Sequence, residues 1–134
     1  TAFPFYRDRF KGAEGVMGIG GWNPRVKFPG AKEYFDAHVK KFQKEPDRWA
    51  SAFAHASLQI LEKCVAEVGL DRPKIKALLD STEFHTVAGP IKFVKGENVA
   101  TPGMVGQWQK NEFELVWPKT WSTGTAAVPK PAWA

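Results

Sequence analysis

Apolar and polar residues divide the chain into a glycine-rich start, a helical middle from 29 to 81 and a strand-rich end. In the middle segment, mostly apolar side chains first recur at three- and four-residue spacing, which is typical of an amphipathic helix. These positions are Tyr34, Phe35, His38, Val39 and Phe42. Pro46 ends that helix, and the Asp47 carboxylate can accept the free N–H groups of the next one. The pattern therefore predicts two consecutive helices that are separated at Pro46-Asp47.

The second helix is predicted to run from Asp47 to about Val68, where Gly69 supplies a C-terminal cap. Its apolar residues cover more than one stripe, so we expect the helix to be buried on two sides. They are Phe53, Ala56, Leu58, Ile60, Leu61, Cys64, Val65 and Val68. A short third helix follows, with Asp71 as its N-cap. Its inward-facing residues are Ile75, Leu78 and Leu79.

The remaining segments are predicted to form short strands punctuated by glycine and proline. A β-like run from Gly15 to Trp22 is interrupted by glycines and stopped by Asn23-Pro24. Toward the end, residues 104–109 and 112–117 alternate between apolar and polar side chains, and Lys110-Asn111 between them has the chemistry of a hairpin turn. Long helices and short strands together predict a layered α/β fold.

The composition is that of an ordinary globular domain and excludes several classes of protein. Hydrophobic residues make up 43% and charged residues 25% of the chain, and no apolar run approaches the roughly 20 residues that cross a bilayer. His38, His55 and His85 lack the spacing of a zinc site, and neither a nucleophile elbow nor a phosphate-binding loop is present. Cys64 sits on an apolar helix face, as a small buried residue does. We therefore expect no enzymatic activity, no metal and no cofactor.

Several motifs occur in an order that is known from one protein family. From the end of the helical segment onward they are Phe84-His85-Thr86-Val87-Ala88-Gly89-Pro90-Ile91-Lys92-Phe93, Gly106-Gln107-Trp108-Gln109 and Leu115-Val116-Trp117-Pro118. Earlier ones are Ala13-Glu14-Gly15-Val16-Met17-Gly18, a helix from Tyr34-Phe35 to Pro46, and the segment from Ala52 to Leu61. Together they resemble the C-terminal part of a type I periplasmic solute-binding protein, of the branched-chain amino acid (leucine-binding protein-like) family of ABC transporters.

The resemblance implies a partial type I periplasmic-binding-protein fold, a Rossmann-like two-lobe clamshell of the α/β class, with three helices and a terminal β-hairpin. On this mapping, residues 1–19 end lobe two, 20–23 form a hinge, 24–101 belong to lobe one, 102–106 form another hinge, and 107–134 return to lobe two and end in a tail. Because family members are considerably longer than this chain, it is expected to be a fragment. We then expect the missing N-terminal part of the same protein, or a swapped homo-oligomer, to complete the fold.

The hinge residues follow from backbone chemistry and from the same mapping. Gly20, Gly21 and Gly103 can absorb large changes of backbone angle because they carry no Cβ atom. Asn23 and Pro102 flank them and complete the predicted hinge set.

Ligand contacts are expected where the second helix begins, because a helix N-terminus offers free N–H donors and a partial positive charge. By resemblance, the position before its first turn contributes a side chain to the cleft, here Arg48 or Trp49. Arg48 could hold an anion through its planar guanidinium, and Trp49 could stack on an apolar or aromatic ligand. Trp22 lies beside the hinge and is a third candidate. The structural alternatives are a solvated surface position for Arg48 and core packing for both tryptophans.

The resemblance implies a periplasmic (extracytoplasmic) protein that captures a small solute, such as an amino acid or an aromatic or carboxylate compound, by hinge closure. Its partner would be the membrane permease of an ABC transporter. A ligand-sensing receptor domain of the same fold is an alternative, since fold does not fix function. The net charge of +5 raises a nucleic-acid-binding domain as a further alternative, although the basic residues are spread along the chain. The sequence therefore predicts a binding protein that catalyses nothing and binds no nucleic acid.

Overall fold

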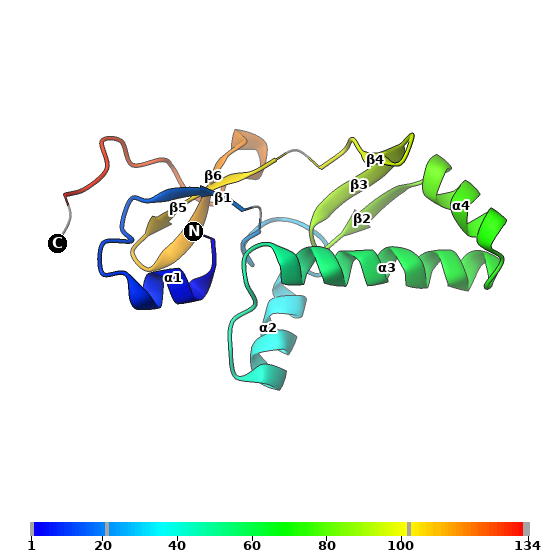
Figure 1. Ribbon diagram of the computed structural model, residues 1–134, viewed down its shortest axis with the longest axis horizontal. Coiled ribbons are helices and arrows are strands. Elements are labelled where there is room, and N and C mark those ends of the chain that lie inside the picture. Colours follow the sequence, from blue (N-terminus) through cyan, green and yellow to red (C-terminus); the bar gives the residue numbers. More distant parts are fainter. Residues whose placement is uncertain (1, 21, 102, 133–134) are drawn as a thin grey trace.

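The computed structural model describes residues 2–20, 22–101 and 103–132, and in it the chain builds two small antiparallel sheets. The first sheet has the order β1-β5-β6 and the second has the order β2-β3-β4. Figure 1 shows them toward opposite ends of an elongated molecule, with two linking segments between them. The strands are β1 (Met17–Ile19), β2 (Glu83–Thr86), β3 (Gly89–Val94), β4 (Glu97–Asn98), β5 (Val105–Gln109) and β6 (Glu112–Trp117).

The three predicted helices are present, and a fourth was not predicted. They are α1 (Pro4–Arg9), α2 (Ala31–Phe42), α3 (Ala50–Val68) and α4 (Arg72–Ser81), and a 3-10 turn, η1 (Lys119–Trp121), follows β6. Gly69 caps α3 with a φ of 68°, and the Asp71 side chain accepts a hydrogen bond from the Lys74 N–H at the start of α4. The helix α1 was not predicted, because six residues are too few to show the hydrophobic periodicity of a helix.

The hairpin between β5 and β6 forms where the sequence placed it. Lys110 and Asn111 have φ values of 51° and 67°, the left-handed pair that a two-residue hairpin turn requires. Gly106 lies in β5 opposite Leu115, and a Cβ atom there would approach the Phe113 ring to 2.2 Å. Glycine at that position lets the aromatic ring pack directly on the strand.

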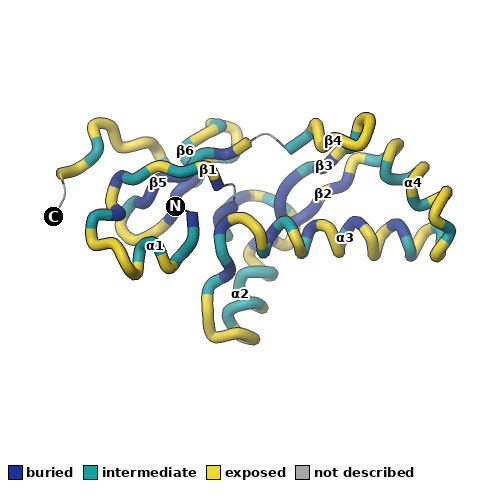
Figure 2. Tube along the Cα trace, viewed as in Figure 1, coloured by how far each residue is buried: buried dark blue, intermediate teal, exposed yellow. Residues whose placement is uncertain are grey.

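The prediction that the second helix is buried on two sides was wrong. In α3 the buried residues form one stripe, in which Ala56, Ile60 and Cys64 pack toward β2, β3 and α4, and Ala52 packs into the core at the junction. Leu58 and Leu61 lie outside this stripe and are 64% and 50% exposed. Figure 2 shows buried and exposed positions alternating along the helix. Within the described part of the chain, no element covers the second apolar stripe.

The core is divided into clusters that follow the two sheets and the junction between them. One cluster joins α3 to the β2–β3 hairpin, and another lies under β5 and β6. The cluster at the junction draws on the linker, the start of both long helices and β6: Trp22, Val26, Ala31, Ala52, Met104 and Leu115. Among the described helices, none combines the length and apolar character needed to span a membrane.

Candidate functional site

The two linking segments run side by side where the sheets meet. Ile19 pairs with Val105 at the end of β1, and the Gly20 N–H donates to the Met104 carbonyl at 3.4 Å. A small hollow of about 170 Å³ opens against this pair of linkers. Its walls are Ile19, Gly20, Trp49, Phe53, Asn98, Thr101, Gly103 and Met104. The hollow therefore brings the start of α3 together with both linkers.

Trp49 is held at the mouth of this hollow by the capping of α3. It is the residue before the helix, and its N–H donates to the Asp47 carboxylate at 2.8 Å. The same carboxylate accepts hydrogen bonds from the Ser51 N–H and hydroxyl. The backbone is thus fixed while the indole remains 57% exposed. Such an indole is a ready apolar surface for a ligand.

Asp47 is the polar anchor of this arrangement. Its partial burial raises the pKa of the carboxyl, but hydrogen bonds from Ser51 and from the N–H groups of Trp49 and Ala50 outweigh that effect and hold the pKa below its usual value. The carboxylate therefore stays ionised at neutral pH. The sequence correctly identified Asp47 as the cap, although it acts from two residues before the N-cap position.

Arg48 points into the protein instead of toward the hollow, and its side chain is only 1% exposed. Its Nη2 donates to Glu45 Oε2 at 2.8 Å and lies 3.9 Å from Glu112 Oε2, while the guanidinium sits 5.3 Å from the Phe35 ring centre. Burial lowers the pKa of Arg48, against the opposing effect of the two carboxylates. Nε and Nη1 have no hydrogen-bond partner. The cation is thus buried with its hydrogen bonding incomplete, an energetically costly state.

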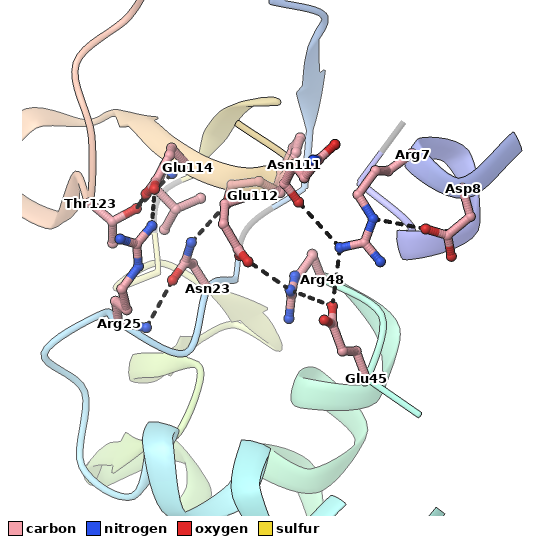
Figure 3. Close-up of polar contacts among 12 residues, drawn as sticks. Arg7, Asp8, Asn23, Arg25, Glu45, Arg48, Asn111, Glu112, Glu114 and Thr123 are labelled. Carbon is pink, nitrogen blue, oxygen red and sulfur yellow. Dashed lines mark hydrogen bonds and ion pairs between the residues drawn. The ribbon is translucent and has the colours of Figure 1, made fainter. Parts of the chain in front are cut away.

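These charges connect parts of the chain that are distant in sequence. Glu45 also lies 3.8 Å from Arg7 Nη1, and Arg7 donates to the Asn111 carbonyl at 3.2 Å. Figure 3 shows Glu45 and Arg48 between Arg7 of α1 and Glu112 of β6. The network therefore ties the loop before α3 to the first sheet and its helix.

Trp22 and Asn23 anchor the linker to both sheets. The Trp22 indole is fully buried and donates from Nε1 to the Val87 carbonyl at 2.8 Å, beside β2. Asn23 is also fully buried, and its Nδ2 donates to the Phe113 carbonyl of β6 at 2.7 Å. Its Oδ1 accepts from the Arg25 N–H at 2.8 Å. The side chains of both residues are therefore occupied by structural contacts.

The predicted hinge residues have different surroundings. Gly20 is tightly packed, because a Cβ atom there would lie 2.3 Å from the Ala2 Cβ, whereas nothing lies within 4 Å of such an atom at Gly103. Gly21 and Pro102 lie outside the described residues. The hinge assignments and the ligand contacts of Trp22, Arg48 and Trp49 remain predictions.

Sequence reasoning missed the other walls of the hollow. Phe53 was assigned only to the apolar face of its helix. Asn98 and Thr101 carry a local signal, since Asn98 Oδ1 accepts the N–H groups of Ala100 and Thr101 in a side-chain-capped turn. Nothing in the sequence placed that turn beside Trp49. No group of three or more His, Cys, Asp or Glu side chains suited to a metal ion occurs in the described part of the chain.

Comparisons with known proteins identify the origin of this architecture. The model of the periplasmic binding protein family matches residues 9–112. An ABC transporter substrate-binding protein of Desulfitobacterium hafniense in complex with leucine shares 18% identity, with a TM-score of 0.64 over 77% of this chain and 31% of that one. A leucine-binding protein of Thermotoga maritima shares 20% identity, with a TM-score of 0.61 over 77% and 30%. No curated protein sequence matches.

A third solved structure agrees with these two. The solute-binding protein of an ABC transporter from R. palustris, in complex with benzoate, has 14% identity and a TM-score of 0.66, covering 86% of this chain and 31% of that one. At such identities the structures establish the fold, a partial type I periplasmic-binding-protein fold. The chain spans about a third of the length of these solved relatives. Because the family model matches most of the sequence, the chain belongs to the periplasmic binding protein family.

Proposed function

We propose that this chain is part of an extracytoplasmic solute-binding protein of an ABC transporter, and that it contributes Trp49 to the solute site. The observation that carries the proposal is the exposed indole at the capped start of α3, in a hollow formed with both linkers. The family is one of solute-binding proteins, and the similar structures bind leucine or benzoate. The whole protein would deliver its solute to a membrane permease and catalyse no reaction.

The two sheets correspond, on this proposal, to the two lobes of a clamshell. The sheet β1-β5-β6 would belong to lobe two, and residues 24–101, which contain the sheet β2-β3-β4, to lobe one. Residues 20–23 and 102–106 would act as the hinge. A solute that contacts both lobes stabilises the closed state by its greater affinity for that state. The position of the hollow against the paired linkers supports this mapping.

The walls around Trp49 favour a solute with an apolar body and a polar end. Trp49 and Phe53 offer aromatic surface, and the Asn98 amide, which donates one N–H to the Thr101 hydroxyl, offers its second N–H as a polar group. An amino acid with an apolar side chain, or an aromatic carboxylate, has this character. The net charge of +5 favours the approach of an anionic solute. In the arrangement seen here Trp22 and Arg48 are buried, so they would reach a solute only after the two sheets move apart.

Calorimetric titration of the purified chain with leucine and with benzoate tests the proposal. We expect one of the two to bind, and Trp49→Ala to weaken that binding about tenfold, because aromatic contact area is lost. Trp117→Ala is the matched control, since Trp117 is 54% exposed and does not line the hollow. Equal losses in both variants would contradict the assignment of Trp49. If Arg48→Met abolished binding and Trp49→Ala left the affinity unchanged, Arg48 would be the residue that contacts the solute.

A further inference from the structure

A second hollow, of about 480 Å³, opens at the junction and shares no lining residue with the hollow at Trp49. Three segments meet around it: linker residues 25–29, the hairpin of β2 and β3, and the turn η1 after β6. Its volume lies within the range of about 300–1,000 Å³ that small-molecule sites occupy. Because the walls come from the linker, one hairpin and the turn after β6, the hollow exists only in the assembled fold.

One wall of this second hollow is aromatic and already ordered. Phe28 and Trp121 meet edge to face, with ring centres 5.1 Å apart and planes at 84°. Both rings pack against the junction core around Trp22. Gly89 allows this placement, because a Cβ atom there would lie 3.0 Å from the Phe28 ring. A ligand ring would thus meet a preformed surface and would not have to order it.

The rim of the hollow carries more positive than negative charge. Arg25 and Lys27 both line it, and Glu83 is the one carboxylate among the lining residues. Arg25 is paired with Glu114 but keeps 54% of its side chain exposed. Lys27 makes no ion pair with any residue that the structure describes. Glu83 Oε1 lies 4.0 Å from Nε2 of His85, another residue of the same rim. Lys27 is therefore the cation that remains available to an incoming anion.

We propose that this second hollow binds a small aromatic carboxylate, with its ring against Trp121 and its carboxylate at Lys27. The aromatic wall supplies apolar contact area, and the ammonium group supplies charge recognition. Thr120 lines the same rim, and its hydroxyl can donate to the second carboxylate oxygen, whereas the Ser122 hydroxyl already donates to the Lys119 carbonyl at 3.0 Å. Binding here would connect the β2–β3 hairpin to the segment after β6. It would occur independently of the solute site at Trp49.

Fluorine NMR of the chain labelled with 5-fluorotryptophan separates the two hollows. The protein has six tryptophans, and the Trp121→Phe and Trp49→Phe variants assign one resonance to each hollow. Benzoate is the probe, and benzyl alcohol is its neutral analogue. We expect benzoate to shift the Trp121 resonance with saturation, and benzyl alcohol to require about fivefold higher concentration because it lacks the charge.

Charge variants make the proposal falsifiable. Lys27→Glu is expected to raise about fivefold the benzoate concentration that shifts the Trp121 resonance. Lys40→Glu, on the exposed face of α2, makes the same change of charge and is expected to leave that concentration unchanged. A Trp121 shift that never saturates, or that Lys27→Glu leaves unchanged, overturns the site. A response confined to Trp49 also overturns it while supporting the proposed function. A response confined to Trp121 supports the second hollow and leaves the solute site at Trp49 to the leucine titration, so the two proposals fail separately.

Discussion

Three consecutive residues illustrate how the backbone assigns different roles to neighbouring side chains. Asp47 accepts the N–H groups at the start of α3, Arg48 is buried against Glu45, and Trp49 stands exposed at the hollow. Trp49 has φ and ψ of −143° and −80°, outside the helical region, so the chain turns sharply there. The turn sends adjacent side chains to opposite sides. The sequence pattern identified both Arg48 and Trp49 as candidate ligand contacts, but it could not predict that one is buried and the other exposed.

Replacement of Asp47 tests the cap at the residue scale. Asp47→Ala should lower the free energy of unfolding by about 1 kcal/mol at neutral pH, since the first-turn N–H groups lose their acceptor. Asp47→Asn keeps an acceptor and serves as the matched control. Urea denaturation followed by circular dichroism measures both variants.

The pH dependence of this effect has a definite sign. The folded pKa of Asp47 is depressed, so its ionic stabilisation is complete above the unfolded pKa of about 3.9 and is lost as the pH falls through the lower folded value. The advantage of wild type over Asp47→Asn should therefore be present at neutral pH and vanish in strong acid. An advantage that grows on acidification would show that the carboxylate is not the stabilising form.

At the scale of elements, local sequence signals and burial contribute separately. The caps of α3 and α4 and the turn between β5 and β6 follow rules of adjacent residues, and they occur where the sequence placed them. Burial of a helix face depends on which other elements exist to cover it. Leu58 and Leu61 are exposed because the core with β2 and β3 forms on another stripe of α3, and α4 only borders Leu61 across an open groove.

Substitution of Asn111 tests the hairpin turn. Asn111 has φ of 67°, a conformation that β-branched residues tolerate poorly. Asn111→Val should lower the free energy of unfolding by about 1–2 kcal/mol, whereas Asn111→Gly should change it by less than about 0.5 kcal/mol. The bond from Arg7 to the Asn111 carbonyl is to main chain and persists in both variants. Equal stability of the Val and Gly variants in thermal unfolding would rule out a left-handed turn.

For the molecule as a whole, the division of the core into clusters leaves apolar surface uncovered. Ile19 at the edge strand β1 is 86% exposed, in addition to Leu58 and Leu61 on α3. The chain spans about a third of the length of its solved relatives. We propose that this surface is covered by another part of such a protein or by a second copy of the chain, because exposed apolar patches and free strand edges favour association.

Sedimentation velocity tests the second of these possibilities for the isolated chain. We expect association that increases with protein concentration. The double variant Leu58→Lys, Leu61→Lys should shift the distribution toward the monomer, because it removes apolar area from α3. Glu62→Lys introduces positive charge on the same helix without removing an apolar side chain, and it should leave association intact. A wild type that stays monomeric at every concentration would contradict the expectation.

Prediction from sequence was most accurate where the cause is local. Gly69, Asp71 and Asn111 act on their immediate neighbours, and each was assigned correctly. The assignments that depend on distant partners were less complete. Phe53 and Thr101 join Trp49 in one hollow although up to about fifty positions separate them along the chain, and no periodicity encodes that meeting.

The three longer helices, the hairpin, the caps and the family could be predicted from the sequence alone, because they depend on spacing, on turn chemistry and on the order of motifs. Three outcomes depend on the tertiary fold: Arg48 is buried against Glu45, Trp22 and Asn23 hold the linker to both sheets, and Phe28 contacts Trp121 on one wall of a second hollow. Those outcomes depend on which surfaces the fold brings together. Whether a residue is buried depends on the element that packs against it as much as on the residue itself, whereas a helix forms largely from its own sequence.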